Sequence, residues 1–227
     1  MSDYFCKEVK DSEQKGWCKV VQLFVGAYNC MSSKGLIIKL YHAVTSLKKD
    51  STEYVEQRWE KELDIVITED IWTNAWKTQS TTTNWLGWRD ICWNNLIRFF
   101  ITPKQKSKQT NIQLGCWREC GENMVGHAHI FWLCPSIQTY WKEVTEVIDK
   151  VLGFGVDMTF IFLYLGNLPE ELDKDDEYLL KMMMAAGKKA ITKHWLQKDI
   201  PTVGTFVGMV KHLHLLEQMT YYLRLQK

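Results

Sequence analysis

The sequence lacks the motifs on which most catalytic and nucleotide-binding sites are built. It contains no glycine-rich phosphate loop, no dinucleotide-binding glycine fingerprint, no Gly-x-Ser-x-Gly nucleophile turn and no His-Glu-x-x-His metal motif. Its longest apolar runs, residues 20–28 and 158–166, are far shorter than the roughly 20 residues of a membrane span. We therefore expect a protein that is not an enzyme, has no small-molecule substrate and does not insert into a membrane.

An excess of charge and the marks of secretion are also missing. The 28 lysines and arginines nearly balance the 27 aspartates and glutamates, and a net charge of +1 gives no overall field toward nucleic acid or membrane. The chain has no Asn-x-Ser/Thr glycosylation acceptor, and its first residues, MSDYFCKEVK, do not resemble a signal peptide. Its 7 cysteines cannot all pair with one another because their number is odd. These features predict reduced thiols and an intracellular location, in the nucleus or cytoplasm.

Apolar residues with helical spacing predict a mostly α-helical, irregular domain. Hydrophobic residues make up 46% of the 227 residues and 11 are tryptophans, enough to bury a sizeable core. The tryptophans recur at the spacing of a buried helix face, so we expect them to pack in the core rather than stack on bases. This spacing and the capping residues predict helices at about residues 51–63, from 68 onward, 85–101, 135–152, 179–197 and 203–225. Ser51 and Thr68 are expected to begin the first two, and Pro135 and Gly153 to begin and end the fourth. The apolar stripe of the helix at 85–101 runs from Trp85 to Phe99, and Thr102 and Pro103 are expected to end it.

Two short stretches and a group of carboxylates lie between these predicted helices. Residues 79–84 are polar and are predicted as a loop. Residues 160–165 are apolar and form either a short strand or a single helical turn. Carboxylates at positions 170, 171 and 175–177 precede the helix predicted at 179–197. We expect them at its positive N-terminal end rather than in a metal or acid–base site.

Three cysteines and two histidines lie close together in the stretch CWRECGENMVGHAHIFWLC, residues 116–134. Three residues separate Cys116 from Cys120, eight more precede His129, and four separate His129 from Cys134. Three thiolates and one imidazole complete the tetrahedral coordination of a structural zinc ion and leave no position for a substrate. Thiolate and imidazole also favour zinc over cations that prefer oxygen ligands. The alternative is that these cysteines are ordinary core residues.

His127 is a competing ligand because only one residue separates it from His129. In an extended segment the two rings would point to the same side. The spacing to Cys134 favours His129, which leaves His127 as an imidazole beside the site or at the surface. The predicted centre is therefore a small Cys-Cys-His-Cys zinc knuckle, with Trp117 and Trp132 either packing around it or stacking on bases.

The segment that leads into this cluster is basic. No aspartate or glutamate occurs in residues 91–118. The basic residues that we consider there are Arg98, Lys104, Lys106, Lys108 and Arg118. The three lysines alternate with neutral residues, so in an extended conformation they would line one edge. We predict that the five side chains contact phosphates of RNA or DNA without sequence specificity, with a salt slope of about −4. The alternative is a solvated surface loop.

Several stretches resemble a known family of mobile elements. NLIRFFITPKQKSKQT, GCWRECGE, HAHIFWLCP and SIQTYWKEV are similar to the region after the reverse transcriptase domain in polyproteins of LINE-type, non-LTR retrotransposons, in particular those of fish. The likeness extends to KGLIIKLYHAV and QRWEKEL on one side and to MMAAGKKAITKHWL and TYYLRLQK on the other, so it covers residues 34–227. In this family a Cys-Cys-His-Cys zinc-binding segment follows a basic approach and precedes a tryptophan-containing helix.

This resemblance implies a module that helps to engage template RNA or target DNA during reverse transcription, with a reverse transcriptase domain as a further partner. It covers neither catalytic domain of the family. The aromatic-x-Asp-Asp turn of the polymerase is missing, because the single Asp-Asp pair, at residues 175 and 176, lies in the charged stretch KDDEY. Nothing in the chain resembles the endonuclease.

Two functions fit these features. The first is a non-catalytic zinc-binding and nucleic-acid-binding module. The alternative is a protein-interaction module, or an inert fragment of an element, whose tryptophan-rich helices would pack against a reverse transcriptase or another protein. We expect four regions along the chain: an N-terminal segment outside the resemblance (1–32), a helical region with the basic arm (33–110), the knuckle and the following helix (111–152), and a C-terminal helical region (153–227).

Overall fold

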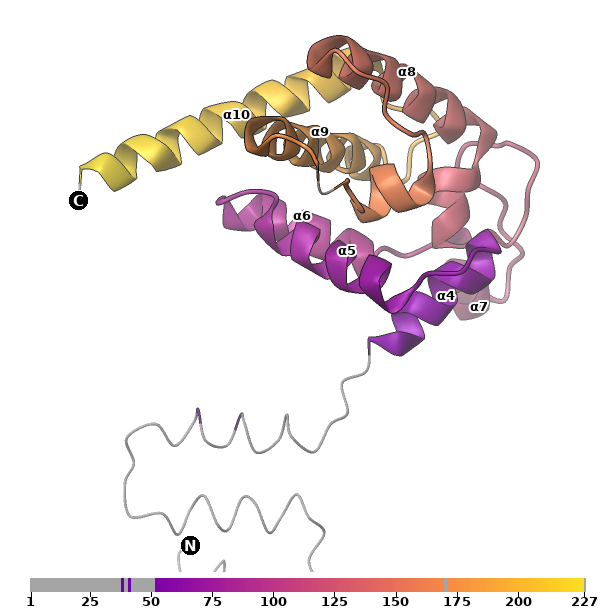
Figure 1. Cartoon of the computed structure of the whole chain (residues 1–227). Coiled ribbons are helices and arrows are strands. Elements are labelled where there is room, and N and C mark those ends of the chain that lie inside the picture. Colours follow the sequence, from indigo (N-terminus) through magenta and orange to yellow (C-terminus); the bar gives the residue numbers. More distant parts are fainter. Residues whose placement is uncertain (1–37, 39–40, 42–51, 170, 227) are drawn as a thin grey trace, which may run out of the picture. The chain divides into compact units, whose positions relative to one another are not determined.

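The computed structural model describes residues 38, 41, 52–169 and 171–226 of the chain (Figure 1). Tyr54–Lys227 forms one compact unit, and Met1–Glu53 belongs to a separate one. The predicted N-terminal segment 1–32 and the predicted helix cap at Ser51 lie outside the described residues.

Helices make up almost all of the regular structure in the described residues, which confirms the predicted fold class. They are α4 (Glu53–Leu63), α5 (Glu69–Thr81), α6 (Leu86–Leu96), α7 (Pro103–Thr110), η1 (His129–Leu133), α8 (Pro135–Leu152), η2 (Phe160–Leu165), α9 (Lys174–Lys193) and α10 (Val203–Leu225). The described part has no β-strand, and one isolated antiparallel bridge joins Gly115 to Asn123. Both η1 and η2 are short turns of π-helix, so residues 160–165 are helical and not a strand. No described helix is both long enough and apolar enough to cross a membrane.

Several helix ends follow the capping residues that the sequence indicates. The hydroxyl of Thr68 accepts a hydrogen bond from the backbone N–H of Ile71 (3.4 Å) and begins α5. Pro135 opens α8, and Gly153 closes it with a φ of 78°, a left-handed conformation that glycine adopts without strain. Three of the predicted carboxylates lie in the first turn of α9, at its positive end: Asp175, Asp176 and Glu177.

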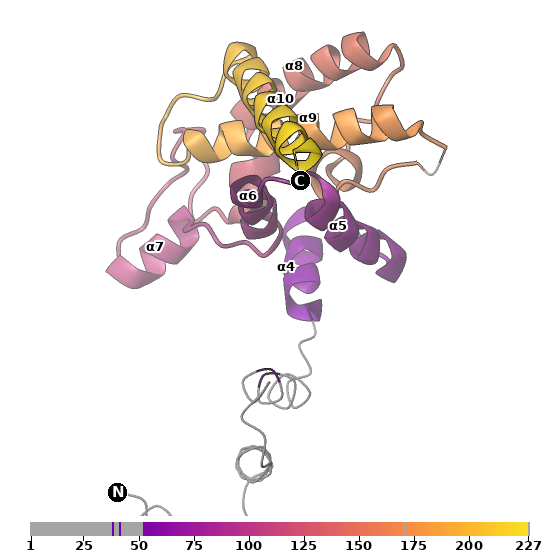
Figure 2. The ribbon, with the colours of Figure 1, turned by 90° about the vertical axis from the view of Figure 1, so that its left-hand side faces the viewer.

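Helix α9 is central to the compact unit. It packs against α10, α6, α8 and η2 (Figures 1 and 2). Residues 182–186 of α9 are all buried, as expected of a helix that is covered on every side. Aromatic side chains from four other elements are buried in the same core: Trp59 of α4, Phe131 of η1, Trp141 of α8 and Tyr164 of η2. The Nε1–H of Trp141 donates to the backbone oxygen of Phe131 (2.9 Å) and so ties α8 to η1.

A buried lysine explains why α5 continues into the stretch predicted as a loop. The helix ends at Thr81, and Gln79 is buried although its neighbours in sequence are polar. Lys188 of α9 donates from Nζ to Oε1 of Gln79 (2.7 Å) and to the backbone oxygen of Tyr164 (3.0 Å). Gln79 in turn donates from Nε2 to the backbone oxygen of Leu165 (3.0 Å). These partners satisfy the buried polar groups, and the loop prediction is wrong for residues 79–81.

The helix predicted at 85–101 is shorter in the structure. α6 ends at Leu96, and Arg98 follows with a positive φ of 62° that turns the chain away from the helix axis. The central residues of the predicted apolar stripe are buried as expected, but its first and last members, Trp85 and Phe99, are exposed.

Thr102 and Pro103 begin a helix rather than end one. The hydroxyl of Thr102 accepts from the N–H of Gln105 (3.3 Å), and the N–H of Thr102 donates to Oε1 of Gln105 (2.8 Å). This reciprocal pair is a capping box, and proline is favoured at the first helical position. The lysine-rich segment, expected to be extended, is therefore the helix α7.

Candidate metal centre

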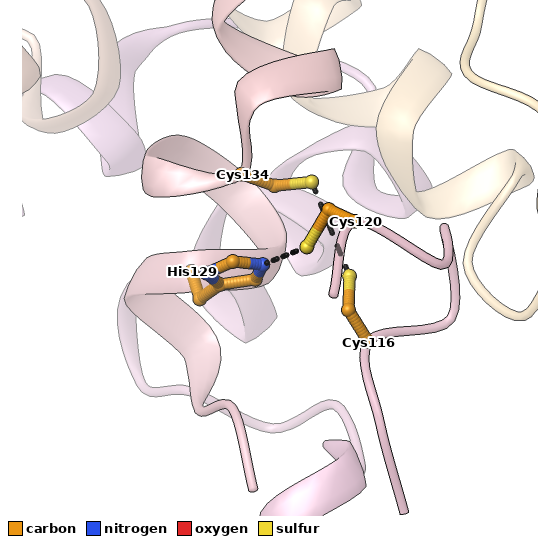
Figure 3. A group of neighbouring side chains, drawn as sticks. All are labelled: Cys116, Cys120, His129 and Cys134. Atoms are coloured by element: carbon orange, nitrogen blue, oxygen red, sulfur yellow. Dashed lines mark hydrogen bonds between the residues drawn. The ribbon is translucent and has the colours of Figure 1, made fainter. Parts of the chain in front are cut away.

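Four side chains from the predicted knuckle converge at one point (Figure 3). Cys116 and Cys120 lie on the loop between α7 and η1, His129 begins η1, and Cys134 immediately precedes α8. Their sulfur and nitrogen atoms all lie within 4.8 Å of one another. The spacing prediction that grouped these four residues is confirmed, and together they could hold a metal ion.

The distances in this cluster match the edges of a tetrahedral site. The sulfurs of Cys116 and Cys134 are 3.9 Å apart, and the sulfur of Cys120 lies 3.3 Å from Nε2 of His129. Zinc–sulfur bonds of about 2.3 Å and zinc–nitrogen bonds of about 2.0–2.1 Å place two sulfurs about 3.8 Å apart and a sulfur and a nitrogen about 3.6 Å apart. The geometry is therefore compatible with zinc, with Nε2 as the ligating atom of His129.

The cluster is held between a tight loop and the start of α8. The N–H of Cys116 donates to the backbone oxygen of Glu122 (2.8 Å), which closes the loop around Gly121. Gly121 has a φ of 93°, and this left-handed turn brings Cys120 back toward Cys116. Cys134 is fully buried, whereas Cys120 is partly exposed. An ion therefore has access to the site from the side of Cys120.

A shared proton already favours a thiolate in the pair Cys116 and Cys134. The hydrogen bond from the Cys116 thiol lowers the pKa of Cys134 to about 3, and the same bond raises the pKa of Cys116. The four described cysteines, at positions 92, 116, 120 and 134, are free thiols. Thiolate is the form that binds metal ions, so metal binding is expected to release the remaining protons.

Glu62 of α4 positions the turn that carries His129, although sequence reasoning did not identify it. Its Oε2 accepts from the N–H of Ala128 (3.0 Å), and its Oε1 accepts from Arg98. A Cβ atom on Gly126 would lie only 2.5 Å from Glu62 Oε1, so glycine leaves the space that the carboxylate occupies. No local pattern marks Glu62, because its partners follow it by 36 and 66 residues.

His127 lies in the aromatic core and not beside the cluster or at the surface. Its ring stacks on Phe131 at 6.1 Å and lies 6.3 Å from both Trp59 and Trp195. Burial, together with the nearby charge of Arg98, lowers the pKa of His127 to about 3. The prediction for this residue is wrong because the His-Ala-His segment is helical, so side chains two positions apart point in different directions.

The five predicted phosphate-contacting residues divide into two groups. Lys104, Lys106 and Lys108 are exposed on α7, and Lys106 lies 5.6 Å from the ring of Trp117. Arg98 pairs with Glu62 and is 7% exposed, whereas Arg118 is 5% exposed. Both arginines are thus withdrawn from solvent, and we remove them from the phosphate-contacting set. Trp132 packs on Trp141 and is buried, so it is unavailable for base stacking.

Comparison with known protein families gives no further assignment. No family model matches this chain.

Proposed function

We propose that this protein is a non-catalytic, zinc-stabilised module that binds RNA or DNA through its phosphates. The observation that carries the proposal is the convergence of three thiols and one imidazole within 4.8 Å, directly after a helix that carries three exposed lysines. Zinc is the metal that such a ligand set favours, and four protein ligands give it a structural role.

The helix α7 is the best candidate for the phosphate-binding surface. No aspartate or glutamate lies within ten positions of any of its lysines in the sequence, so the helix itself carries no carboxylate that would repel a phosphate. Lys108 borders a surface hollow of about 370 Å³ that also contains Ile112 and Met124. Ile112 is 61% exposed, and its apolar side chain provides a surface against which a nucleic-acid base can pack.

Three lysines limit the strength of this interaction. Each phosphate contact contributes about −0.7 to −0.9 to the slope of log affinity against log salt, so three contacts give about −2 to −3. This is weaker than the sequence-based value of about −4, because the two arginines no longer contribute. Such binding is non-specific and suits an accessory grip within a larger assembly.

The resemblance to the region after the reverse transcriptase domain of LINE-type elements supports the same function. On this proposal the template RNA or the target DNA is the nucleic-acid partner, and a reverse transcriptase domain is the protein partner. The basic helix and the cluster occur in the order that the resemblance implies, with the helix first.

A second candidate function, a protein-interaction module, is favoured by the surface of α10. The last three turns of this helix expose a series of large apolar side chains, each more than half exposed: Leu215, Met219, Tyr221, Tyr222, Leu223 and Leu225. Exposed apolar groups of this kind often mark a protein contact.

Salt-dependent binding to a mixed-sequence oligonucleotide separates these functions. We expect the zinc-loaded protein to bind fluorescent RNA or DNA with a salt slope of about −2 to −3. The variant K104A/K106A/K108A should lose most of that slope while its circular dichroism spectrum stays unchanged. A matched control, K142A/K150A/K211A, removes exposed lysines from α8 and α10 and should keep the slope. Absence of binding at low salt would contradict the nucleic-acid function and leave the protein-interaction module.

A further inference from the structure

Arg118 has a buried guanidinium, and only one of its three nitrogens has a hydrogen-bond partner among the described residues. It lies on the loop of the cluster, two positions after Cys116, and is 5% exposed. Its Nη1 donates to the backbone oxygen of Ile130 (3.0 Å). Its Nε and Nη2 are buried and have no hydrogen-bond partner among the described residues. A buried cation with two unused donors requires a negative group nearby.

No carboxylate supplies that negative charge in the described part of the chain. The ion pairs there join Arg98 to Glu62, Lys181 to Glu177 and Lys198 to Glu119, and none includes Arg118. Arg118 lies midway between Cys116 and Cys120 in the loop, and its bond to Ile130 holds it next to His129. The buried guanidinium is therefore held among the residues of the cluster.

The net charge of a zinc centre with these ligands is opposite and equal to the charge of one guanidinium. Three thiolates carry three negative charges, zinc carries two positive charges, and a neutral imidazole adds none, so the centre has a net charge of −1. One guanidinium reduces the total to zero. We propose that Arg118 is the counter-cation of an anionic zinc centre and that its Nε and Nη2 donate hydrogen bonds to the sulfurs of Cys116 and Cys134. This inference rests on the zinc binding proposed above.

Arginine is suited to this position because of its shape. The planar guanidinium carries donors on several edges, so it bonds the carbonyl of Ile130 and two sulfurs at the same time, whereas a lysine ammonium is a single compact charge. A buried cation stabilises the deprotonated ligands and the net negative charge of the bound centre, so we expect Arg118 to increase zinc affinity. Hydrogen bonds to a thiolate also withdraw electron density from sulfur, which should slow the attack of electrophiles on the bound thiolates.

The first test measures zinc affinity by competition with a chromophoric chelator. Removal of groups that support metal ligands typically weakens binding about 10–100-fold. We expect a loss of that size in Arg118→Met and an incomplete recovery in Arg118→Lys. The rate at which iodoacetamide releases zinc should rise in the same order. The matched control is K188M, which removes a buried cation of α9 whose partners are Gln79 and the backbone oxygen of Tyr164, and it should leave zinc affinity unchanged.

The outcomes separate this inference from the function on which it rests. A wild-type protein that binds no zinc overturns the proposed metal site and, with it, this role of Arg118. A wild-type protein that binds one zinc ion, with equal affinity in Arg118→Met, overturns only the role of Arg118. An equal loss of affinity in Arg118→Met and in K188M also overturns it, because the effect would then come from general destabilisation.

A second measurement uses the unaltered chain, since loss of a buried arginine also affects folding. In protein loaded with cadmium-113 in place of zinc, nuclear spin coupling passes from the metal through sulfur to a hydrogen-bonded proton. We expect a cadmium–proton correlation at the guanidinium N–H of Arg118. A fully loaded protein without this correlation would contradict the proposed N–H···S bonds.

Discussion

His127 and His129 are two residues apart, but their rings lie in different environments. The ring of His129 places Nε2 3.3 Å from the sulfur of Cys120, whereas the ring of His127 lies among Trp59, Phe131 and Trp195. Each helical residue turns the side chain by about 100°, so two positions place the rings on nearly opposite sides. The two histidines therefore provide a natural pair of variants for the metal site.

We expect His129→Ala to lose bound zinc and His127→Phe to keep it. The first change removes one of four ligands and opens the site, while the second replaces a buried ring with another ring of similar size. Zinc per chain, measured by elemental analysis after dialysis, distinguishes them. Equal loss of zinc from both variants would mean that His127 also supports the metal, which contradicts its place in the aromatic core.

The pKa of His127 predicts a loss of stability in mild acid. The folded protein protonates this ring only near pH 3, whereas the unfolded chain protonates it near its ordinary pKa of about 6.5. The unfolded state thus binds more protons as pH falls below about 6.5, and the free energy of unfolding decreases by up to about 1.4 kcal/mol per pH unit. Between pH 7.0 and pH 5.5 the expected loss from this residue is about 1 kcal/mol.

His127→Phe removes this source of acid sensitivity. Urea unfolding of both proteins at pH 7.0 and 5.5, with zinc chelated in each, isolates the contribution of the histidine because all other groups are shared. The stability of the variant should fall less than that of the wild type. Parallel losses in the two proteins would show that the ring is already protonated, or accessible, in the folded state.

At the level of elements, the contact between α4 and the turn before η1 depends on Gly126. Its Cβ position lies 2.5 Å from the Glu62 carboxylate, which is fixed by the N–H of Ala128 and by Arg98. In Gly126→Ala the carboxylate has to move and weaken both bonds, and such overpacking costs about 1–3 kcal/mol. Gly208→Ala is the matched control, because its Cβ meets nothing within 4 Å and it lies inside α10.

We expect opposite effects on stability from these two alanines. Alanine in a helix interior is favoured over glycine by about 0.5–1 kcal/mol, so Gly208→Ala should be stabilising. Thermal or urea unfolding of both variants measures the difference. A neutral effect of Gly126→Ala would mean that the carboxylate of Glu62 moves without loss and does not fix the turn.

Local sequence signals suffice where an element depends on its immediate neighbours. Thr68, Pro135 and Gly153 mark the ends of α5 and α8 because a cap acts within one helical turn. The four zinc ligands are also close together in the sequence, within residues 116–134. Their spacing alone therefore indicates that one loop and one helical turn can bring them together. The predicted zinc ligands therefore coincide with the residues that converge in the structure.

The predictions that failed depend on partners far away in the sequence. Gln79 is helical and buried because Leu165 and Lys188 satisfy its amide from 86 and 109 residues away. Arg98 is withdrawn from the surface by Glu62, which precedes it by 36 residues. A basic residue near a metal motif looks the same in sequence whether it faces solvent or the core, so only packing distinguishes the exposed lysines of α7 from the buried arginines.

For the compact unit as a whole, the metal site lies at the border of the core, because Cys116 and Cys134 belong to the buried cluster while Cys120 only packs against it. Helix α9 is covered by α10, α8, α6 and η2, and these helices pack on one another outside the loop that carries Cys116 and Cys120. That loop, in contrast, has few backbone hydrogen bonds of its own, and the pair Cys116–Glu122 is one of them. The energy of zinc binding should therefore stabilise the loop and the start of α8 more than the rest of the compact unit.

This difference predicts partial rather than complete unfolding on removal of zinc. We expect a chelator to increase amide hydrogen exchange in residues 112–134, while the amides of α9 keep most of their protection and the helical circular dichroism signal changes little. Zinc fingers without a core of their own unfold completely under the same treatment, because the metal supplies most of their folding energy. In Cys134→Ser, which already lacks a ligand, the chelator should cause no further change. Loss of protection throughout α9 and α10 on chelation would contradict this prediction. It would mean that the aromatic core folds only when the metal is bound.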